Sequence, residues 1–391
     1  MYLTRIKIKN WRNFKDAEVS DLSEIVYVLG PNASGKSNFL DALRFLRDLA
    51  RPKGGGLQEA IHQRGGMSKI RCLHARRDTE VLLEVDVSTA KDSKLWTYTI
   101  GFNIPASGSR IPTVTREIVK VITRDGTEQV LLQRPNPDDR IDPVQLQQTY
   151  LEQINTNGKF RELGSFLGDI TYVHLVPQLL KFGAQIGGKT LDSDPFGQEF
   201  MLRIARTPRK TREVRLRRIQ VGLQAIVLNL HDLRFVQDPD SGHPHLEIRF
   251  LHHRPRGAKQ QEDQFSDGTL RLISLLWLLQ DSGDGPILLE EPELSLNEEI
   301  VKELPLVFSK IRGKIKNPRQ VILTTHSWML LDNPGIDRSG IVVVHPSLDG
   351  STIGKTTAEE DQALSAGFSP AEVVMPRARR VSETGQLKFE F

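Results

Sequence analysis

A stretch near the N-terminus constrains the fold of this chain more than any other feature. Residues 30–37 read Gly-Pro-Asn-Ala-Ser-Gly-Lys-Ser, and a short apolar run over 26–29 precedes them. Apolar residues then recur at helical spacing from Phe39 to Leu49. A glycine-containing turn between a strand and a helix is the setting in which the pattern G-x-x-x-x-G-K-S binds phosphate. The sequence therefore predicts an α/β unit that holds a nucleoside triphosphate.

The residue types in this turn suit that chemistry. Gly35 lets the backbone curl so that its N–H groups face a phosphate, and the helix N-terminus adds its positive dipole end. Lys36 is expected to reach the β- and γ-phosphates, and the Ser37 hydroxyl is expected to ligate Mg²⁺. Asn32 and Asn38 belong to the same predicted nucleotide site. ATP and Mg²⁺ are thus the expected cofactors.

Length and composition set broad limits on the rest. A chain of 391 residues can form two or three lobes, and a net charge of only +4 means that DNA binding would need a local basic patch. Cys72 is the only cysteine, which excludes an internal disulfide and a cysteine-based zinc cluster. Residues 1–9 alternate like a strand rather than a signal peptide, and the longest apolar run, 272–279, is too short to span a bilayer. We expect a cytoplasmic protein with no membrane partner.

Changes in patterning divide the chain into four predicted parts. Residues 1–135 form a first lobe that carries the phosphate-binding turn and an antiparallel meander. Residues 136–230 form a linker strand and a helical insertion, and residues 231–350 form a second lobe in which helices and buried strands alternate. Residues 351–391 are expected to be a C-terminal tail with weak periodicity.

Several elements are predicted within these parts. The meander is assigned strands at 81–87, 95–100 and 117–123, with a hairpin turn at Asp125-Gly126. The middle part is assigned a helix near 143–155, a strand at 170–176 and helices over 195–230. A strand–turn–strand unit follows at 231–251.

A second group of polar residues lies in the predicted second lobe. Residues 287–293 read Ile-Leu-Leu-Glu-Glu-Pro-Glu, a buried strand that ends in carboxylates. Beside a phosphate-binding turn, Glu290 and Glu291 would supply a Mg²⁺ ligand and a group that orients the attacking water. Ser266 and Gly268 open an apolar helix and form a second candidate anion site. His326 follows another buried strand.

Four elements follow one another along the chain: the phosphate-binding turn, the helix start at Ser266, the strand that ends in Glu290-Glu291, and the strand before His326. In this order they resemble the ABC-type ATPase heads of SMC proteins, RecF, RecN, the double-strand-break repair ATPase and the OLD family. The motifs that carry the resemblance lie in residues 1–50 and 260–350. The resemblance implies an α/β P-loop NTPase, an ABC-ATPase head with an antiparallel β lobe and a helical insertion between its two halves. It also implies that two chains associate head to tail around ATP.

The resemblance gives each motif residue a role. Residues 30–37 match the Walker A motif, and Glu290-Glu291 match Walker B, with Glu291 in the position of the catalytic glutamate. Ser266 and Gly268 match the signature motif that would face the partner's nucleotide, and His326 matches the switch histidine. Glu290 departs from the usual aspartate by one methylene, and Asp267 and Thr269 depart from the commonest transporter signature.

Two further site residues are assigned from their places along the chain relative to these motifs. Arg12, in the segment Arg12-Asn13-Phe14, matches a family segment that touches nucleotide. In SMC-like heads a glutamine that serves the metal and the attacking water lies on the strand just before the insertion, and Gln178 is assigned to that place. Gln63 is the competing candidate, because it lies closer in sequence to the phosphate-binding turn.

A basic run over residues 203–218 contains eight arginines or lysines and one acid, Glu213. Such a run could bind DNA phosphates, dock an acidic partner protein, or form the solvated face of a helix. We favour protein docking, because the net charge of the chain is small and no base-reading motif accompanies the run.

The predicted function is that of an ATP-hydrolysing switch that dimerises around ATP. Stand-alone heads of this size resemble the ATPase components of bacterial two-gene defence systems, which implies control of a separate effector, often a nuclease, in anti-phage defence. The alternative is a RecF- or SMC-like repair ATPase that binds DNA. An OLD-type nuclease is less favoured because only a short segment follows residue 344, and a transporter ATPase because a long segment separates the turn from the signature.

Overall fold

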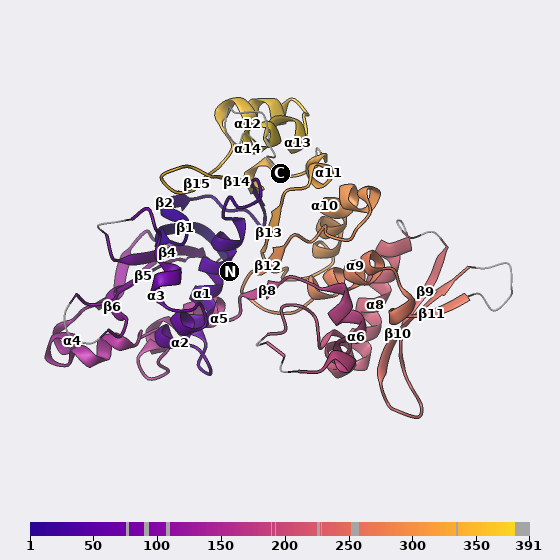
Figure 1. Ribbon diagram of the computed structural model, residues 1–391, viewed down its shortest axis with the longest axis horizontal. Coiled ribbons are helices and arrows are strands. Elements are labelled where there is room, and N and C mark those ends of the chain that lie inside the picture. The colour runs from indigo at the N-terminus through magenta and orange to yellow at the C-terminus, as the bar shows by residue number, and fades with distance from the viewer. Residues whose placement is uncertain are drawn as a thin grey trace, which may run out of the picture.

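The computed structural model describes residues 1–75, 78–89, 94–106, 110–188, 190–191, 193–224, 227, 229–251, 258–333 and 335–379. The strands in these ranges form three sheets. In Figure 1 the first sheet lies at the left, the second in the middle and the smallest at the right. No helix in these ranges is both long and apolar enough to cross a bilayer.

The first sheet has six strands in the order β2-β1-β4-β5-β6-β7, and every neighbouring pair is antiparallel. Its strands are β1 (Tyr2–Trp11), β2 (Phe14–Val19), β4 (Val81–Ser88), β5 (Leu95–Asn103), β6 (Thr113–Ile122) and β7 (Glu128–Arg134). Alternate side chains point into one buried core, which is the pattern of a sheet with one covered face. The predicted meander and its hairpin at Asp125-Gly126 are confirmed.

The second sheet carries the predicted phosphate-binding turn. Its order is β15-β14-β3-β13-β12-β8, and the strands from β14 to β8 are parallel. They are β3 (Ile25–Leu29), β8 (Thr171–Val173), β12 (Ile287–Glu290), β13 (Val321–Thr325), β14 (Ile341–His345) and the antiparallel β15 (Thr352–Gly354). Because both faces are covered, these strands read as continuous apolar runs.

Two hydrophobic cores meet at this parallel sheet. Val28 faces the core shared with the first sheet and α1 (Lys36–Ala50), whereas Leu29 faces the core of α9 (Asp267–Leu278) and α10 (Glu298–Arg312). The third sheet, in the order β11-β10-β9, belongs to the second core. Its strands are β9 (Leu230–Gln237), β10 (Pro244–Phe250) and β11 (Ala258–Gln261). The predicted strand–turn–strand unit over 231–251 is confirmed.

The remaining helices connect and cover the sheets. On the first lobe lie α2 (Leu57–His62), α3 (Met67–Ile70), α4 (Pro137–Ile141), η1 (Pro143–Gln147), η2 (Asn157–Phe160) and α5 (Arg161–Gly168). The insertion contributes α6 (Pro177–Ile186), α7 (Phe200–Arg206) and α8 (Arg209–Gln224), and η3 (Glu262–Gln264) follows β11 in the second lobe. The C-terminal part contributes α11 (Trp328–Leu331), η4 (Arg338–Gly340), α12 (Ala358–Ser365), α13 (Pro370–Val373) and α14 (Met375–Arg379).

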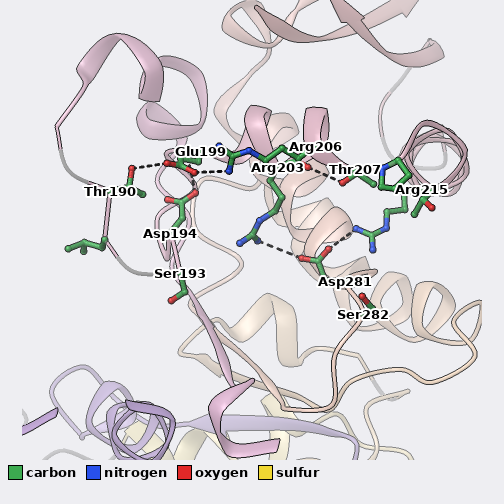
Figure 2. Close-up of a pocket in the computed structure, with 13 residues that line it drawn as sticks. Thr190, Ser193, Asp194, Glu199, Arg203, Arg206, Thr207, Arg215, Asp281 and Ser282 are labelled. Atoms are coloured by element: carbon green, nitrogen blue, oxygen red, sulfur yellow. Dashed lines mark hydrogen bonds and ion pairs between the residues drawn. The ribbon is translucent and has the colours of Figure 1, made fainter. Parts of the chain in front are cut away.

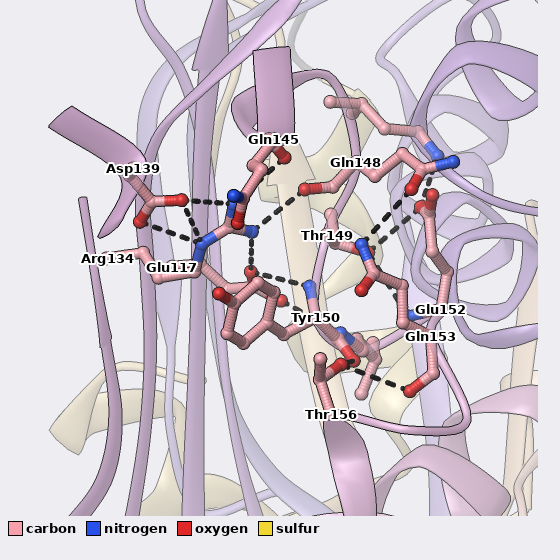
Figure 3. A network of polar contacts seen from close by, with 12 residues as sticks. Glu117, Arg134, Asp139, Gln145, Gln148, Thr149, Tyr150, Glu152, Gln153 and Thr156 are labelled. Atoms are coloured by element: carbon pink, nitrogen blue, oxygen red, sulfur yellow. Dashed lines mark hydrogen bonds and ion pairs between the residues drawn. The ribbon is translucent and has the colours of Figure 1, made fainter. Parts of the chain in front are cut away.

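Two predicted elements differ from the structure. The helix predicted near 143–155 is wrong: this segment has a short 3₁₀ turn at its start and then irregular backbone. The reason is Glu117, whose buried carboxylate accepts the N–H groups of Tyr150 and Leu151 at 2.8 and 3.0 Å and so replaces helical hydrogen bonds (Figure 3). The strand predicted over 170–176 is shorter, because the next amides, such as that of His174, bond to the segment around Pro195 instead.

Candidate nucleotide site

The phosphate-binding turn joins the end of β3 to the start of α1. Gly35 has φ +111°, and a Cβ there would lie 2.1 Å from the side-chain nitrogen of Asn13, so only glycine suits this corner. Asn13 in turn donates to the carbonyl of Ser34 at 2.8 Å, which holds the turn from the first sheet. No side chain caps α1. Its first N–H groups are therefore available to an anion, and the cradle fits a nucleotide phosphate.

Lys36 lies across this turn with its ammonium directed at the loop. Its Nζ donates to the carbonyls of Gly30 and Pro31 at 2.9 and 3.0 Å, and the residue is buried. Burial lowers the pKa of the Lys36 ammonium, while the nearby acids Glu291 and Glu293 oppose that shift. A buried ammonium held by two carbonyls can exchange them for phosphate oxygens.

The Ser37 hydroxyl lies in direct contact with Glu290 at the end of β12. It donates to Glu290 Oε1, and Tyr172 on β8 donates its hydroxyl to Glu290 Oε2. Serine and carboxylate oxygens are ligands of the kind that Mg²⁺ prefers, so this pair fits the metal. The described residues contain no group of three or more His, Cys, Asp or Glu side chains placed to hold a metal. The remaining Mg²⁺ ligands would therefore come from phosphates and water.

Glu291 and His326 meet at the same edge of the sheet. His326 Nδ1 lies 3.0 Å from Glu291 Oε1, and β12 and β13 pair in parallel, so their ends are neighbours. Glu291 has the left-handed φ of +43°, which turns its side chain away from the course of the strand. Behind this pair, the hydroxyl of Thr325 donates to buried Glu293 at 2.5 Å, and burial raises the pKa of the Glu293 carboxyl.

Ser266 and Gly268 lie at the start of α9. Ser266 is exposed, and its hydroxyl caps the helix by accepting the N–H of Thr269 at 3.1 Å. Gly268 packs on the segment after β12, since a Cβ there would lie 2.6 Å from the carbonyl oxygen of Ser295. In the described contacts of one chain the Ser266 hydroxyl bonds only to Thr269 and to no group of the phosphate-binding turn.

Comparison with known proteins places this architecture. Residues 1–98 match a family model described as "AAA ATPase domain", and residues 184–333 match one described as "AAA domain, putative AbiEii toxin, Type IV TA system". An SMC head bound to the C-winged helix domain of ScpA superimposes with a TM-score of 0.53 at 14% identity, covering 92% of this chain and 100% of that one.

Part of the chain is also similar in sequence to curated proteins. The DNA replication and repair protein RecF of Bacillus cytotoxicus is 29% identical over 96 residues, and that of Lactococcus lactis subsp. cremoris is 33% identical over 89 residues. The alignments cover 24% and 23% of this chain, and 26% and 25% of the relatives, so the chain spans about a quarter of the length of the curated relatives it matches. The chain therefore has the fold of an SMC head, and parts of its sequence are similar to AAA ATPase domains and to RecF proteins.

Tyr172 is a residue of the candidate site that sequence reasoning missed. β8 pairs with β12 so that Tyr172 stands opposite Leu288, two residues before Glu290. The guanidinium of Arg44 on α1 lies 4.0 Å from the centre of the Tyr172 ring, which fixes the ring beside the carboxylate. The only sequence signal was a hydroxyl-bearing aromatic in a short apolar strand, and nothing local indicates that this strand neighbours β12.

The glutamine assigned to the SMC-type position does not lie on a strand. Gln178 is exposed in the first turn of α6, because β8 already ends at Val173 and Pro177 starts the helix. The expectation that Gln178 lies on the strand before the insertion is therefore wrong, and its catalytic and metal roles stay predictions. Gln63 caps α2 and donates to Glu59 at 2.9 Å.

The flanking residues of the predicted site lie around the turn. Arg12 donates to Asp41 on α1 at 2.9 and 2.7 Å, so its guanidinium is held against the helix that follows the turn. Asn38 donates to Asn13 Oδ1 at 2.8 Å, and Asn32 is exposed on the loop. Their contacts with a nucleotide stay predictions.

Several side chains of the basic run, residues 203–218, contact other residues of the same chain. Asp281, just after α9, pairs with Arg215 at 2.6 Å and with Arg203 at 3.6 Å, beside a cavity of about 760 Å³ (Figure 2). Arg212 lies 3.9 Å from the centre of the Phe235 ring. Arg203, Arg212 and Arg215 therefore have partners within the chain, and the roles predicted for the run stay predictions. The exposed cations of the run are Arg206, Arg209, Lys210 and Arg217.

Proposed function

We propose that this head binds ATP with Mg²⁺ and hydrolyses it. The observation that carries the proposal is the meeting of α1, β12 and β13 at one edge of the parallel sheet: Ser37 contacts Glu290, and the adjacent Glu291 contacts His326. A phosphate cradle, a metal-binding oxygen pair and a carboxylate–histidine pair thus adjoin one another. Ligands of open α/β sheets bind beyond the carboxyl ends of the strands, where this group lies.

Each residue then has a part in hydrolysis. Mg²⁺ would neutralise charge on the phosphate oxygens while Ser37 and Glu290 hold it. Lys36 would leave the two loop carbonyls and bind the β- and γ-phosphates. Glu291 would accept a hydrogen bond from the attacking water and orient it in line with the leaving group. His326 holds the Glu291 carboxylate at 3.0 Å and would contact the γ-phosphate.

Substitution of Glu291 tests this assignment. Glu291→Gln should keep ATP affinity, because the phosphate cradle is intact, and should lower kcat by roughly a hundredfold or more, because the amide is no base. Lys36→Ala should instead weaken ATP binding, measured by calorimetry. A purified wild-type chain with no ATPase activity, or a Glu291→Gln variant with unchanged turnover, would sink the proposal.

The hydrolysing unit is a head-to-tail dimer. Ser266 is exposed at the N-terminus of α9 and bonds within its own chain to Thr269, which leaves its outer face for a second copy. Each composite site would combine Lys36, Ser37, Glu290 and Glu291 of one chain with Ser266 and Gly268 of the other. ATP would then join two chains and hydrolysis would separate them, as in a switch.

Control of a separate effector in anti-phage defence, in the cytoplasm, is the finer part of this proposal. The words "AbiEii toxin" in the description of the model that matches residues 184–333 favour it. An operon partner that co-purifies with the ATP-bound dimer and is released on hydrolysis would support it. A partner whose binding ignores the nucleotide would contradict it.

A second candidate is an ATPase that acts on DNA, favoured by the relatives named as DNA replication and repair proteins. Its natural contact is the exposed part of the basic run, where Arg209, Lys210 and Arg217 face solvent. Changing these three to Glu should abolish duplex binding in a gel-shift titration if each contacts phosphate, and the salt dependence of wild-type binding should show about 0.9 log units per contact. Retained DNA binding in the triple variant excludes this surface, and simultaneous release of a partner protein would identify it as a docking face.

A further inference from the structure

The start of α9 and the segment after β12 are fastened together at two points. Gly268 packs so closely on Ser295 that a Cβ would lie 2.6 Å from its carbonyl oxygen. One turn further along α9, Arg271 donates from Nη2 to the main-chain carbonyl of Glu291 at 2.9 Å. The helix that begins with Ser266 is therefore tied to the residue proposed to orient water in the same chain.

The tie is made by a deeply buried charge. Arg271 is 3% exposed, and it is the only charged residue in the apolar stretch from Leu270 to Leu279. Its Nε has no hydrogen-bond partner among the described residues, and neither has Oε2 of buried Glu293 nearby. A buried guanidinium without a hydrogen-bonded carboxylate is costly to keep, which indicates that its position serves something other than stability.

The carbonyl that Arg271 holds belongs to a strained backbone. Glu291 and Ser295 both have left-handed φ values, +43° and +64°, although neither is glycine. Such conformations persist where surrounding contacts fix them. The backbone N–H of Glu291 donates to Thr324, and its carbonyl accepts two bonds, from the N–H of Leu294 at 3.2 Å and from Arg271 at 2.9 Å. Loss of the Arg271 bond would leave the carbonyl to the longer bond from Leu294 alone, which would loosen the turn and let the carboxylate move away from His326.

We propose that Arg271 is a positioning residue for Glu291. It holds the left-handed turn at Glu291, and it links that turn rigidly to α9, whose N-cap residue Ser266 is the one proposed to face the partner chain. The inference rests on the proposed hydrolysis and names a residue of the same site that the motifs do not include. Arg271 does not touch the nucleotide; it acts through the Glu291 backbone.

The test separates turnover from binding. Arg271→Gln should lower kcat by roughly a hundredfold, because a displacement of about 1 Å at a reacting group is enough for such a loss. ATP affinity, measured by calorimetry, should stay within about threefold, because Lys36 and the phosphate cradle are untouched. Arg271→Lys, which keeps a cationic donor, should recover part of kcat.

Arg312→Gln is the matched control. Arg312 is also a buried arginine near the end of a helix, it donates to the carbonyl and carboxylate of Glu24 at 3.0 and 2.9 Å, and it lies at the opposite end of β3. A purely structural arginine should lower the melting temperature without separating kcat from affinity. Arg312→Gln is expected to do that, and Arg271→Gln is expected to lose far more kcat than any shared loss of stability explains.

The outcomes are distinguishable from failure of the proposed function. If the wild-type chain does not hydrolyse ATP, the proposed function itself fails. If the wild type hydrolyses and both Arg271 variants keep kcat, or lose affinity and kcat together as Arg312→Gln does, the positioning role is overturned. If Arg271→Gln does not fold, Arg271→Lys decides: reduced kcat at unchanged affinity supports the role, and wild-type kcat refutes it.

Discussion

At the scale of single residues, the Glu290 carboxylate is held from two sides. Ser37 donates to one oxygen and Tyr172 to the other, and these hydroxyls come from α1 and β8. A carboxylate fixed in this way presents its oxygens in one orientation. If Glu290 holds Mg²⁺ in place of the usual aspartate, we expect the Tyr172 hydrogen bond to orient its carboxylate toward the metal.

Tyr172→Phe should weaken Mg²⁺ use without disturbing the fold. The phenylalanine ring keeps the contact with Arg44, so the melting temperature should hardly change, while Glu290 loses one of its two donors. We expect the Mg²⁺ concentration for half-maximal ATPase to rise by about tenfold, as for other residues that orient a metal ligand. A magnesium titration of the steady-state rate measures this, and an unchanged titration curve would show that Tyr172 only packs.

The residues that sequence reasoning placed correctly lie in contiguous motifs. The turn at 30–37 lies between a strand and the helix that directly follows it, and Glu290-Glu291 lies at the end of a single strand. The residues next to each motif in the sequence therefore determine its geometry. Tyr172 and Arg271 act through neighbours far away in the chain, and Gln178 was assigned by layout alone. A charge at Arg271 inside an apolar helix was a usable signal, because buried charges need a reason.

At the scale of elements, the least predictable segment is the one between β7 and α5. The sequence predicts a helix near 143–155, yet the backbone is organised by a buried cluster in which Arg134 pairs with Glu117 at 3.0 Å and Asp139 at 2.6 Å (Figure 3). Arg134 also lies 3.9 Å from the centre of the Tyr150 ring. Such a cluster depends on residues from β6, β7 and the segment itself, so no local window shows it.

Glu152 provides a pH test of this segment. Its carboxylate accepts the N–H of Leu57 and the hydroxyl of Thr149, and burial raises its pKa above the ordinary 4.5. The folded state therefore holds the proton more tightly than the unfolded state, and stability is lost as pH rises from 4.5 through the folded pKa. In Glu152→Gln that loss is absent, because the amide oxygen can accept both bonds without ionising.

Urea denaturation at two pH values measures the effect. Near pH 4 the variant and the wild type should be about equally stable, and near pH 7 the variant should be the more stable of the two. Glu162→Gln, exposed on α5, is the control and should show no such divergence. If Glu152→Gln is less stable at both pH values, the ionised carboxylate contributes to the fold and the expected sign is wrong.

At the scale of the whole molecule, the parallel sheet belongs to two cores at once. Its alternate residues pack against the first lobe on one side and against α9, α10 and the insertion on the other. The phosphate cradle comes from the N-terminal part of the chain and Glu290, Glu291 and His326 from the C-terminal part, so the half-site exists only when both fold together. The strong periodicity of α1 and of these strands is why the fold class was predictable from sequence.

We expect the second half of each composite site to come from another molecule. Ser266→Arg should leave calorimetric ATP binding to the single chain nearly intact, since Ser266 contacts no residue of the phosphate-binding turn in the described contacts. In the Glu291→Gln background, where hydrolysis would not release the dimer, the same change should abolish ATP-dependent dimerisation measured by light scattering, because a bulky cation would occupy the partner's γ-phosphate place. Ser165→Arg, exposed on α5, is the control and should dimerise normally.

A mixture of two variants then tests how many competent ATP sites each dimer has. A pair formed from Ser266→Arg and Lys36→Ala chains has one site with an intact turn and an intact signature serine, and one site that lacks both. The mixture should therefore recover at most half of the wild-type ATPase rate per dimer, although neither variant alone is active. No recovery on mixing, or ATP-dependent dimers of the Ser266→Arg chain equal to those of the parent, would show that the second chain contributes nothing to the site.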